Sequence, residues 1–375
     1  MSTAIVSDLH LANRPGTDLL SRPKIRGRLI EAIEGVDRVV LLGDLVELRE
    51  APVADAVEAA RPLFRELGEA VGDGRIVVVP GNHDYQLAAD LLEPRRLEPD
   101  PAPLEAEQQV EPASHSPLGR LAAGAGRAKV TLAYPGVWLR PDVYATHGHY
   151  MDYHNTVPTF ERLAAGISRR IVGPPPDGRM TPDDYEAALS PIYSLAYQLA
   201  QASPAARRVT GGGTSVRIWQ ALSGNHRAGV QAKVAGALVG GVLWPGAVAA
   251  LNALRLGPLN PDLSGRELRR AGLRGMAEVV VRLGVDAEHV IFGHTHRAGP
   301  LPGDDEGWDL PGGGRLTNSG SWLYDWAFIG RSGSESPYWP GVVIFVEDEG
   351  PPELRRLLDD LTPEELLPER ARAQS

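Results

Sequence analysis

Two histidines two residues apart, His294 and His296, directly follow a short apolar run. The run at 290–292 predicts a buried strand, and Gly293 marks its end. In extended backbone the side chains of residues i and i+2 point to the same side, so the two imidazoles share one face. Two neutral imidazoles on one face are suited to a divalent metal ion, although an isolated pair of this kind is more often a loop feature without a ligand.

The same arrangement recurs at four other strand ends. Apolar, β-branched runs at 3–7, 38–42, 75–79 and 142–146 predict strands, and a polar side chain follows each of them within three residues. In open α/β sheets, sites form beyond the carboxyl ends of the strands. One aspartate there is ordinary turn chemistry, but the recurrence in one chain indicates a site for a divalent metal. The residues concerned are Asp8, His10, Asp44, Asn82, His83, Asp84 and His147.

The elements that position these residues alternate along the chain. Helices are expected at about 24–34 and 53–71, between the first three strands, which is the order of an α/β fold. With 375 residues, 43% of them hydrophobic, the chain has ample material for a core and allows one large domain or two.

Charge and cysteine content exclude several classes of function. A net charge of −10 argues against a nucleic-acid groove that works by phosphate neutralisation. The sequence has no cysteine, which excludes a disulfide framework, thiolate catalysis and zinc-finger sites, and fits a reducing compartment. The first expected strand begins at Thr3, and a cleaved signal peptide would remove Asp8 and His10, so we expect a cytoplasmic protein.

Five short blocks of the sequence resemble the motifs of the calcineurin-like metallophosphoesterases, in that family's order. They are Asp8-x-His10, Gly43-Asp44, Gly81-Asn-His-Asp84, His147-Gly and Gly293-His-x-His296. The later segment 317–322 is similar to the family's Asn-x-Gly-Ser segment. The resemblance covers about residues 1–90, 128–152 and 285–347. It implies an α/β fold, a four-layer α/β/β/α sandwich, here with a helical insertion as a cap.

The resemblance also implies an enzyme that hydrolyses phosphate esters at a binuclear metal centre. Asp44 would bridge two divalent ions, roughly 3.5–4 Å apart, that activate water and clamp the phosphoryl oxygens. Mn²⁺ is the first expectation, with Fe or Zn²⁺ as alternatives. His83 would act outside the set of metal ligands, as a general acid or a stabiliser of transition-state charge, with Asp84 orienting it. The implied ligands are Asp8, His10, Asp44 and His296 for one ion, and Asp44, Asn82, His147 and His294 for the other.

Other histidines and one aspartate have weaker claims. His149, Asp152 and His154 follow His147 closely, and two interpretations of them stay open with equal weight. They contact the metal ligands or the substrate, or they belong to a polar loop. His115, His226 and His289 stand alone, and we expect them to be structural.

The chain divides into a core and three additions. We expect the metallophosphoesterase core at 1–156 and 285–350, and a helical cap at 157–284. Thr181-Pro-Asp-Asp184 and Ser264-x-x-Glu267 are helix start signals inside the cap. The Pro-rich acidic insertion at 92–117 is expected to be exposed and irregular. The charged C-terminal tail at 351–375 is expected to form a short amphipathic helix through Leu354, Leu357, Leu358 and Leu361.

The stretch 234–254 inside the cap contains no charged residue, and Lys233 and Arg255 flank it. Its length suits a membrane span, but a single crossing would separate His147 from His294, which must reach one site. A helical hairpin with Trp244 at its tip fits better. Two interpretations remain: a hairpin buried as ordinary core, or one in peripheral contact with a membrane or lipid.

The resemblance is compatible with several classes of substrate. A phosphodiester, a pyrophosphate or a phosphomonoester is expected, carried by a phosphorylated small molecule of nucleotide type or by a lipid-linked one. The core plus helical insertion partly resembles the UDP-2,3-diacylglucosamine diphosphatases, which typically carry Arg where this chain has His83. That difference favours a general phosphodiesterase or phosphatase. The alternative class is a non-catalytic scaffold or a membrane-associated binding protein that kept the fold; it predicts losses at the ligand positions, and the sequence has none.

Overall fold

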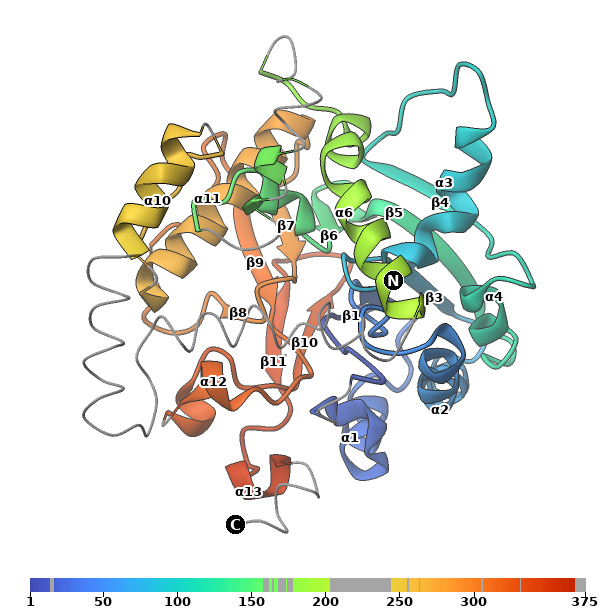
Figure 1. The fold of residues 1–375 in the computed structure, drawn as a ribbon. Helices are drawn as coiled ribbons and strands as arrows, with labels where there is room; N and C mark the ends of the chain where they lie inside the picture. The colour runs from blue at the N-terminus through green and yellow to red at the C-terminus, as the bar shows by residue number, and fades with distance from the viewer. Residues whose placement is uncertain are drawn as a thin grey trace.

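The computed structural model describes most of the chain and shows a mixed α/β fold with a central sheet and helices packed on it (Figure 1). The α/β fold class expected from the sequence is therefore confirmed. The described residues are 1–13, 17–157, 162–163, 165–167, 173, 178–202, 244–254, 256–262, 264–304, 306–330 and 332–367.

The strands follow one another in a continuous hydrogen-bonded order. Two blocks of parallel strands, β1 to β3 and β6, β7 and β9, are joined through β5, which is parallel to β3 and antiparallel to β6. The order is β11 (Glu353–Arg356), β10 (Val342–Val346), β1 (Thr3–Val6), β2 (Arg38–Leu42), β3 (Arg75–Val79), β5 (Lys129–Arg140), β6 (Val143–Thr146), β7 (His289–Phe292), β9 (Arg315–Ser319) and β8 (Ala298–Gly299), with β4 (Glu107–Val110) paired to β5.

The strand β5 is long enough to serve both parallel blocks. Its first part pairs with β3, and its later part, from Gly136, pairs with β6. One buried cluster contains apolar side chains of both blocks, such as Val40 and Val77 on one side and Ala145 and Ile291 on the other. The two blocks therefore pack against each other through apolar faces, and this brings their carboxyl ends together. The full four-layer order of the sandwich stays a prediction.

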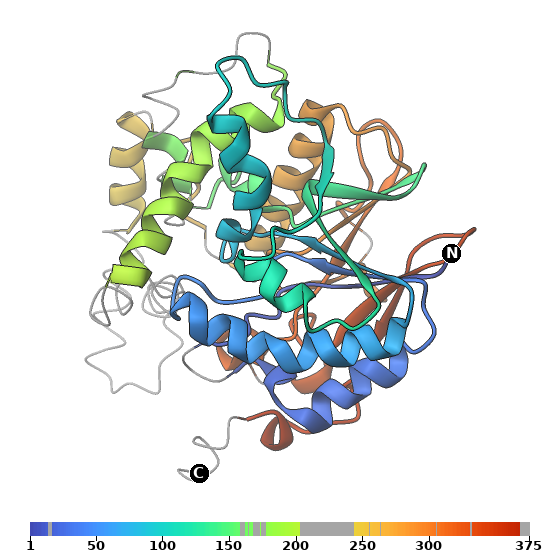
Figure 2. The same cartoon turned by 90° about the vertical axis from the view of Figure 1, so that its right-hand side faces the viewer.

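Helices cover the outer faces of the strands. Figure 2 shows α1 (Pro23–Ala32) and α2 (Val53–Val71) side by side below the sheet, at the helix positions expected from the sequence. The buried side of α2 carries Leu63, Phe64 and Leu67, an i, i+1, i+4 pattern that gives the helix one apolar face. The other core elements are α3 (Ala89–Arg96), α4 (Pro117–Ala122), α12 (Trp326–Ile329), α13 (Pro363–Leu366), η1 (Leu19–Ser21), η2 (Tyr85–Ala88), η3 (His149–Tyr153) and η5 (Gly333–Glu335).

The long insertion contributes helices at the opposite end from α1 and α2. In both views α6 (Pro182–Ala202), α10 (Trp244–Ala253) and α11 (Gly265–Leu283) lie in the upper part of the molecule. Both expected helix starts are confirmed. The Ser264 hydroxyl accepts a hydrogen bond from the Glu267 amide at 3.3 Å, and Thr181 and Asp184 cap α6 reciprocally, since each backbone amide donates to the other side chain. The boundaries of the cap stay a prediction.

Two expectations about irregular segments are wrong. The leucine spacing of the tail predicts a helix through Leu354 and Leu357, but Glu353–Arg356 is strand β11, antiparallel to β10. The open edge of β10 offers backbone hydrogen bonds that a short isolated helix cannot match. The segment 92–117 is also not wholly irregular, because it contains β4 and the buried Leu104.

The uncharged stretch 234–254 is only partly described. Residues 233–243 and 255 lie outside the described residues, and so does the expected hairpin. Trp244 is the first residue of α10, and Val248 is the single buried side chain of that helix. Across the described parts of the chain, no helix combines the length and apolar character that crossing a bilayer requires.

Candidate metal centre

The carboxyl ends of five strands deliver all seven expected metal ligands to one place. Asp8 and His10 follow β1, Asp44 follows β2, and Asn82 follows β3. From the other parallel block, His147 follows β6, and His294 and His296 follow β7. Residues almost 290 positions apart thus face one another because the two blocks of strands pack together.

The first group of potential ligand atoms contains two histidines and two carboxylates. The Nε2 atoms of His10 and His296 are 3.1 Å apart, and His296 Nε2 is 3.3 Å from Asp8 Oδ1. Asp44 Oδ2 is 3.6 Å from His10 Nε2. Atoms at these separations can ligate a common ion after small movements.

The second group lies next to the first and shares Asp44 with it. Asp44 Oδ2 is 3.3 Å from His147 Nε2, which in turn is 3.2 Å from Asn82 Oδ1. Asn82 Oδ1 is also 3.1 Å from His294 Nδ1. One carboxylate oxygen of Asp44 therefore stands between both groups, which is the position of a bridging ligand.

Hydrogen bonds at the outer side of three histidines fix which nitrogen faces inward. His10 Nδ1 bonds Glu47 Oε2 at 3.0 Å, His147 Nδ1 bonds the Leu42 carbonyl at 3.1 Å, and His294 Nε2 bonds the Asp152 carboxylate at 3.1 Å. Carboxylates and carbonyls only accept, so each ring donates outward, and in the neutral form of the ring the inner nitrogen is a bare lone pair. Lone pairs and carboxylate oxygens facing one another at close to 3 Å repel unless a cation lies among them. This donor set fits divalent metal ions.

The electrostatics of the site point the same way. Burial lowers the pKa of His10, but Glu47 and Asp44 outweigh it and raise that pKa to about 9. Burial also lowers the pKa of His147, but the charge and the hydrogen bond of Asp44 outweigh this effect and raise the pKa to about 10. For Asp44 burial favours the neutral form, yet His147 and His83 hold its pKa well below the usual value. The cluster is built to attract positive charge.

Backbone strain is concentrated at the same residues. Among the described residues, five of the six non-glycine residues with positive φ are candidate ligands: Asp8 (55°), His10 (46°), Asp44 (51°), His294 (68°) and His296 (57°). Such conformations cost on the order of 1–3 kcal/mol each and persist where the surrounding structure demands them. Gly81 is required for a different reason, because a Cβ at this position would collide with the His147 ring.

His83 lies at the edge of the cluster and is held by Glu47, which is not among the site residues expected from the sequence. The Nδ1 atom of His83 is 2.7 Å from Glu47 Oε2, the oxygen that also bonds His10. The expected contact with Asp84 is wrong. The buried Asp84 carboxylate instead accepts backbone amide hydrogen bonds from Gly81 (2.7 Å) and Leu45 (2.6 Å), which ties the loop after β2 to the loop after β3. The spacing Asp44-x-x-Glu47 is the sequence signal that could identify Glu47.

The three residues left open after His147 have different surroundings. Asp152 bonds a candidate ligand, His294. His149 is buried beside His147, with ring centroids 5.6 Å apart, and its Nε2 lies 3.2 Å from the Tyr134 hydroxyl. His154 Nε2 bonds the Tyr185 hydroxyl at 2.6 Å. Asp152 thus contacts the candidate metal centre directly, and the two histidines contact tyrosines around it.

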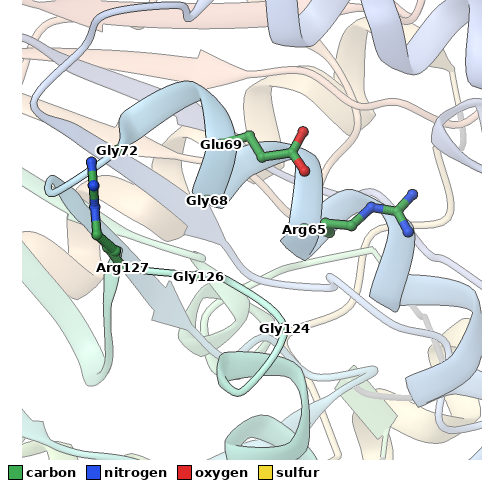
Figure 3. Close-up of a pocket in the computed structure, with 7 residues that line it drawn as sticks. All are labelled: Arg65, Gly68, Glu69, Gly72, Gly124, Gly126 and Arg127. Atoms are coloured by element: carbon green, nitrogen blue, oxygen red, sulfur yellow. The ribbon is translucent and has the colours of Figure 1, made fainter.

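Two other features of the described residues are distant from the site. Asp142, Glu288 and His289 cluster at the opposite ends of β6 and β7, but the Asp142 carboxylate already pairs with Arg140 at 2.6 and 2.7 Å. A shallow hollow of about 280 Å³ on α2 is lined by Arg65, Glu69, Arg127 and four glycines (Figure 3). Its arginines are mostly exposed, and Arg127 pairs with Asp73. His115 is exposed, and His226 lies outside the described residues.

One comparison with known proteins agrees with the resemblance seen in the motifs. Residues 1–172 match the family model of the calcineurin-like phosphoesterases. A cold-active protein-tyrosine phosphatase from a psychrophilic Shewanella species is similar over 94% of this chain and 80% of that chain, at 14% identity and a TM-score of 0.28. A point mutant of that phosphatase gives the same values. Likeness at this level carries no argument about function. No curated protein sequence matches this chain.

The shared position of Asp44 generates a direct prediction about metals. Two divalent ions should bind per chain, and Asp44→Asn should lose most of the occupancy of both, because it removes the anion that the two groups share. Elemental analysis after gel filtration measures this. Asp142→Asn, the same change in the ion-paired cluster at the other end of the strands, should keep both ions. Full occupancy in Asp44→Asn would disprove the bridging position.

Proposed function

We propose that this chain, whose residues 1–172 form a calcineurin-like phosphoesterase domain, is a hydrolase of phosphate esters with a binuclear metal centre. The matched region contains five of the candidate ligands, and His294 and His296 come from a part of the chain beyond it. The observation that carries the proposal is the convergence of histidine nitrogens and carboxylate oxygens around Asp44, an arrangement that divalent cations would stabilise.

The chemistry that we assign to the site combines the family's metals with this chain's own side chains. Two divalent ions held by these residues would supply Lewis acidity, which would activate water and neutralise charge on the phosphoryl group. Asp8, His10, Asp44 and His296 would hold one ion, and Asp44, Asn82, His147 and His294 the other. Mn²⁺ is the proposed ion, with Fe or Zn²⁺ as alternatives, because the mixed nitrogen and oxygen ligands suit all three.

His83 is proposed as the group that assists the leaving oxygen. Its Nδ1 is occupied by Glu47 at 2.7 Å, so Nε2 is the nitrogen left to face a substrate. The carboxylate orients the ring and offsets a positive charge on it, as a proton donor to a leaving group needs. The His83 amide also donates to Asp44 Oδ1 at 2.8 Å, which fixes the position of this residue relative to Asp44. Asp84 supports the arrangement by joining the two loops.

The proposed substrate is a phosphodiester, a pyrophosphate or a phosphomonoester, carried by a phosphorylated small molecule or by a lipid-linked one. The net charge of −10 disfavours nucleic acid. A cytoplasmic location, which the cysteine-free sequence favours, belongs to the same proposal. A screen of phosphomonoesters, phosphodiesters and nucleotide pyrophosphates with added Mn²⁺ tests it. Hydrolysis of at least one class supports the proposal, and inactivity of the metal-loaded protein on all of them contradicts it.

The role of His83 separates catalysis from metal binding. His83→Ala should keep both ions and lower turnover about 10²–10⁴-fold, the usual contribution of a positioned acid–base group. Steady-state kinetics and elemental analysis of the same preparation measure the two quantities. His115→Ala, a change at an exposed histidine outside the site, serves as the control. A loss of metal in His83→Ala would make this residue a ligand, and unchanged turnover would refute its proposed role.

We further propose that α10 helps to recognise an apolar group of the substrate or the surface of a membrane. The helix carries no charge, and its exposed positions include Ala249, Ala250 and Ala253. Exposed apolar helices of this kind favour contact with lipid or a partner. The part of the stretch at 234–243 lies outside the described residues and adds nothing to the support.

Charge placed on α10 should therefore affect substrates selectively. Ala249→Asp combined with Ala253→Asp should slow hydrolysis of phosphodiesters presented on phospholipid vesicles, but not of a small chromogenic diester, because the carboxylates oppose contact with lipid. Ala54→Asp, the same substitution at an exposed alanine of α2, is the matched control. If the α10 variant hydrolyses both substrates at the wild-type rates, the helix does not take part in substrate recognition.

A further inference from the structure

One partly buried carboxylate, that of Glu186, joins helix α6 to three segments of the core. Glu186 accepts hydrogen bonds from three tyrosine hydroxyls: Tyr85 at 2.6 Å, Tyr134 at 2.5 Å and Tyr150 at 2.7 Å. The three tyrosines come from three separate core segments, namely η2, β5 and η3. Burial of a carboxylate is costly unless donors surround it, so this site is a specific arrangement and not an incidental contact.

The hydroxyl protons of the three tyrosines also determine which role the neighbouring His149 has in its hydrogen bond. Each tyrosine hydroxyl has one proton, and all three point to Glu186. The Tyr134 oxygen can therefore only accept from His149 Nε2, which is 3.2 Å away. His149 is therefore part of the same hydrogen-bond network, and the centroid of its ring lies 5.6 Å from that of His147. The hydrogen bonds of α6 thus extend to the immediate surroundings of the metal centre.

The segment η3 connects Glu186 to a candidate metal ligand over only two residues. Tyr150 bonds Glu186, and Asp152 in the same turn bonds His294 Nε2 at 3.1 Å. Helix α6 also holds η3 on the other side of Asp152. The ring of its Tyr185 stacks on Tyr150, with centroids 4.6 Å apart, and its hydroxyl bonds His154. Asp152 is therefore placed between two contacts with α6.

The opposite side of η3 is packed against the second insertion helix, α11. A Cβ at Gly275 would lie 3.1 Å from the Met151 carbonyl oxygen, and one at Gly272 would lie 3.1 Å from the Met151 side chain. Small residues at these two positions let the helix approach η3 closely. The short segment that carries Asp152 thus contacts both α6 and α11.

We propose that Glu186 is a positioning residue of the metal centre, acting through Tyr150 and Asp152 on His294. A histidine ligand needs an outer hydrogen bond for its orientation, and loss of such a partner typically costs about 10–100-fold in metal affinity. Helix α6 then contributes to the metal site through its hydrogen bond to η3. This inference rests on the proposed function in one respect, namely that His294 is a metal ligand.

Two other attachments of α6 supply matched controls. Near its start, Asp183 bonds Arg95 at 2.9 Å and the Leu104 amide at 2.7 Å. Near its end, the Gln201 side chain bonds the carbonyls of Leu48 and Ala51 at 3.2 and 3.1 Å. Neither attachment involves η3. Variants at these positions loosen α6 without breaking the path from Glu186 to Asp152.

The experiment compares Mn²⁺ affinities of the full-length protein by calorimetry. Glu186→Ala should weaken the binding of one of the two ions about 10–100-fold, whereas Asp183→Asn and Gln201→Ala should change it less than about twofold. Glu186→Gln, which keeps an acceptor for Tyr134 and Tyr150, should lie closer to wild type. In an Asp152→Asn background, Glu186→Ala should have no further effect, because both changes interrupt one path.

The metal affinity of a second variant and hydrogen exchange test the same path independently. If Glu186→Ala does not fold, Tyr150→Phe removes one hydroxyl from the same path and should weaken the same ion. Hydrogen exchange of the metal-free protein should increase across 148–154 in Glu186→Ala and not in Gln201→Ala. Unchanged affinity and exchange, or effects that add to those of Asp152→Asn, would overturn the inference. Failure of the wild-type protein to bind Mn²⁺, Fe or Zn²⁺ would instead overturn the proposed function, and the exchange data would still report on the coupling.

Discussion

The structure depends on one electrostatic constraint, the close approach of acceptor atoms around the buried Asp44. Its Oδ2 atom lies 3.6 Å from His10 Nε2 and 3.3 Å from His147 Nε2, and both nitrogens face inward because their partners across the ring accept. Cations relieve the mutual repulsion of such atoms. The left-handed backbone at the ligand positions is explained by the same need, because it turns each side chain from its strand end toward a common centre.

Three carboxylates around the candidate ligands have different tasks. Glu47 bonds both His10 and His83, so it links a candidate ligand with the candidate acid. Asp84 binds backbone amides and shapes the loops. Asp152 orients His294 and is itself placed by an insertion helix. A hydrogen-bonded path thus runs from helix α6 through η3 to His294.

The sequence predicts the features that repeat and misses those that occur once. The strand ends with polar residues recur, so the pattern of the sequence alone identifies Asp8, Asp44 and His294 as candidate ligands. Glu47 and Glu186 have no repeated pattern, since their roles come from tertiary contacts with His83 and with three tyrosines. The leucine spacing around Leu354 predicts a helix, whereas the free edge of β10 makes this segment a strand. Long-range pairing decides that segment against its local pattern.

The central claim is that Asp44 bridges two metal ions held by side chains from both parallel blocks of the fold. Electron paramagnetic resonance of the protein loaded with two equivalents of Mn²⁺ tests this most directly, because two ions that share a carboxylate are magnetically coupled. We predict the spectrum of a spin-coupled pair, which should give way to that of isolated ions in Asp44→Asn. A wild-type spectrum of isolated ions only, with both equivalents bound, would contradict the claim.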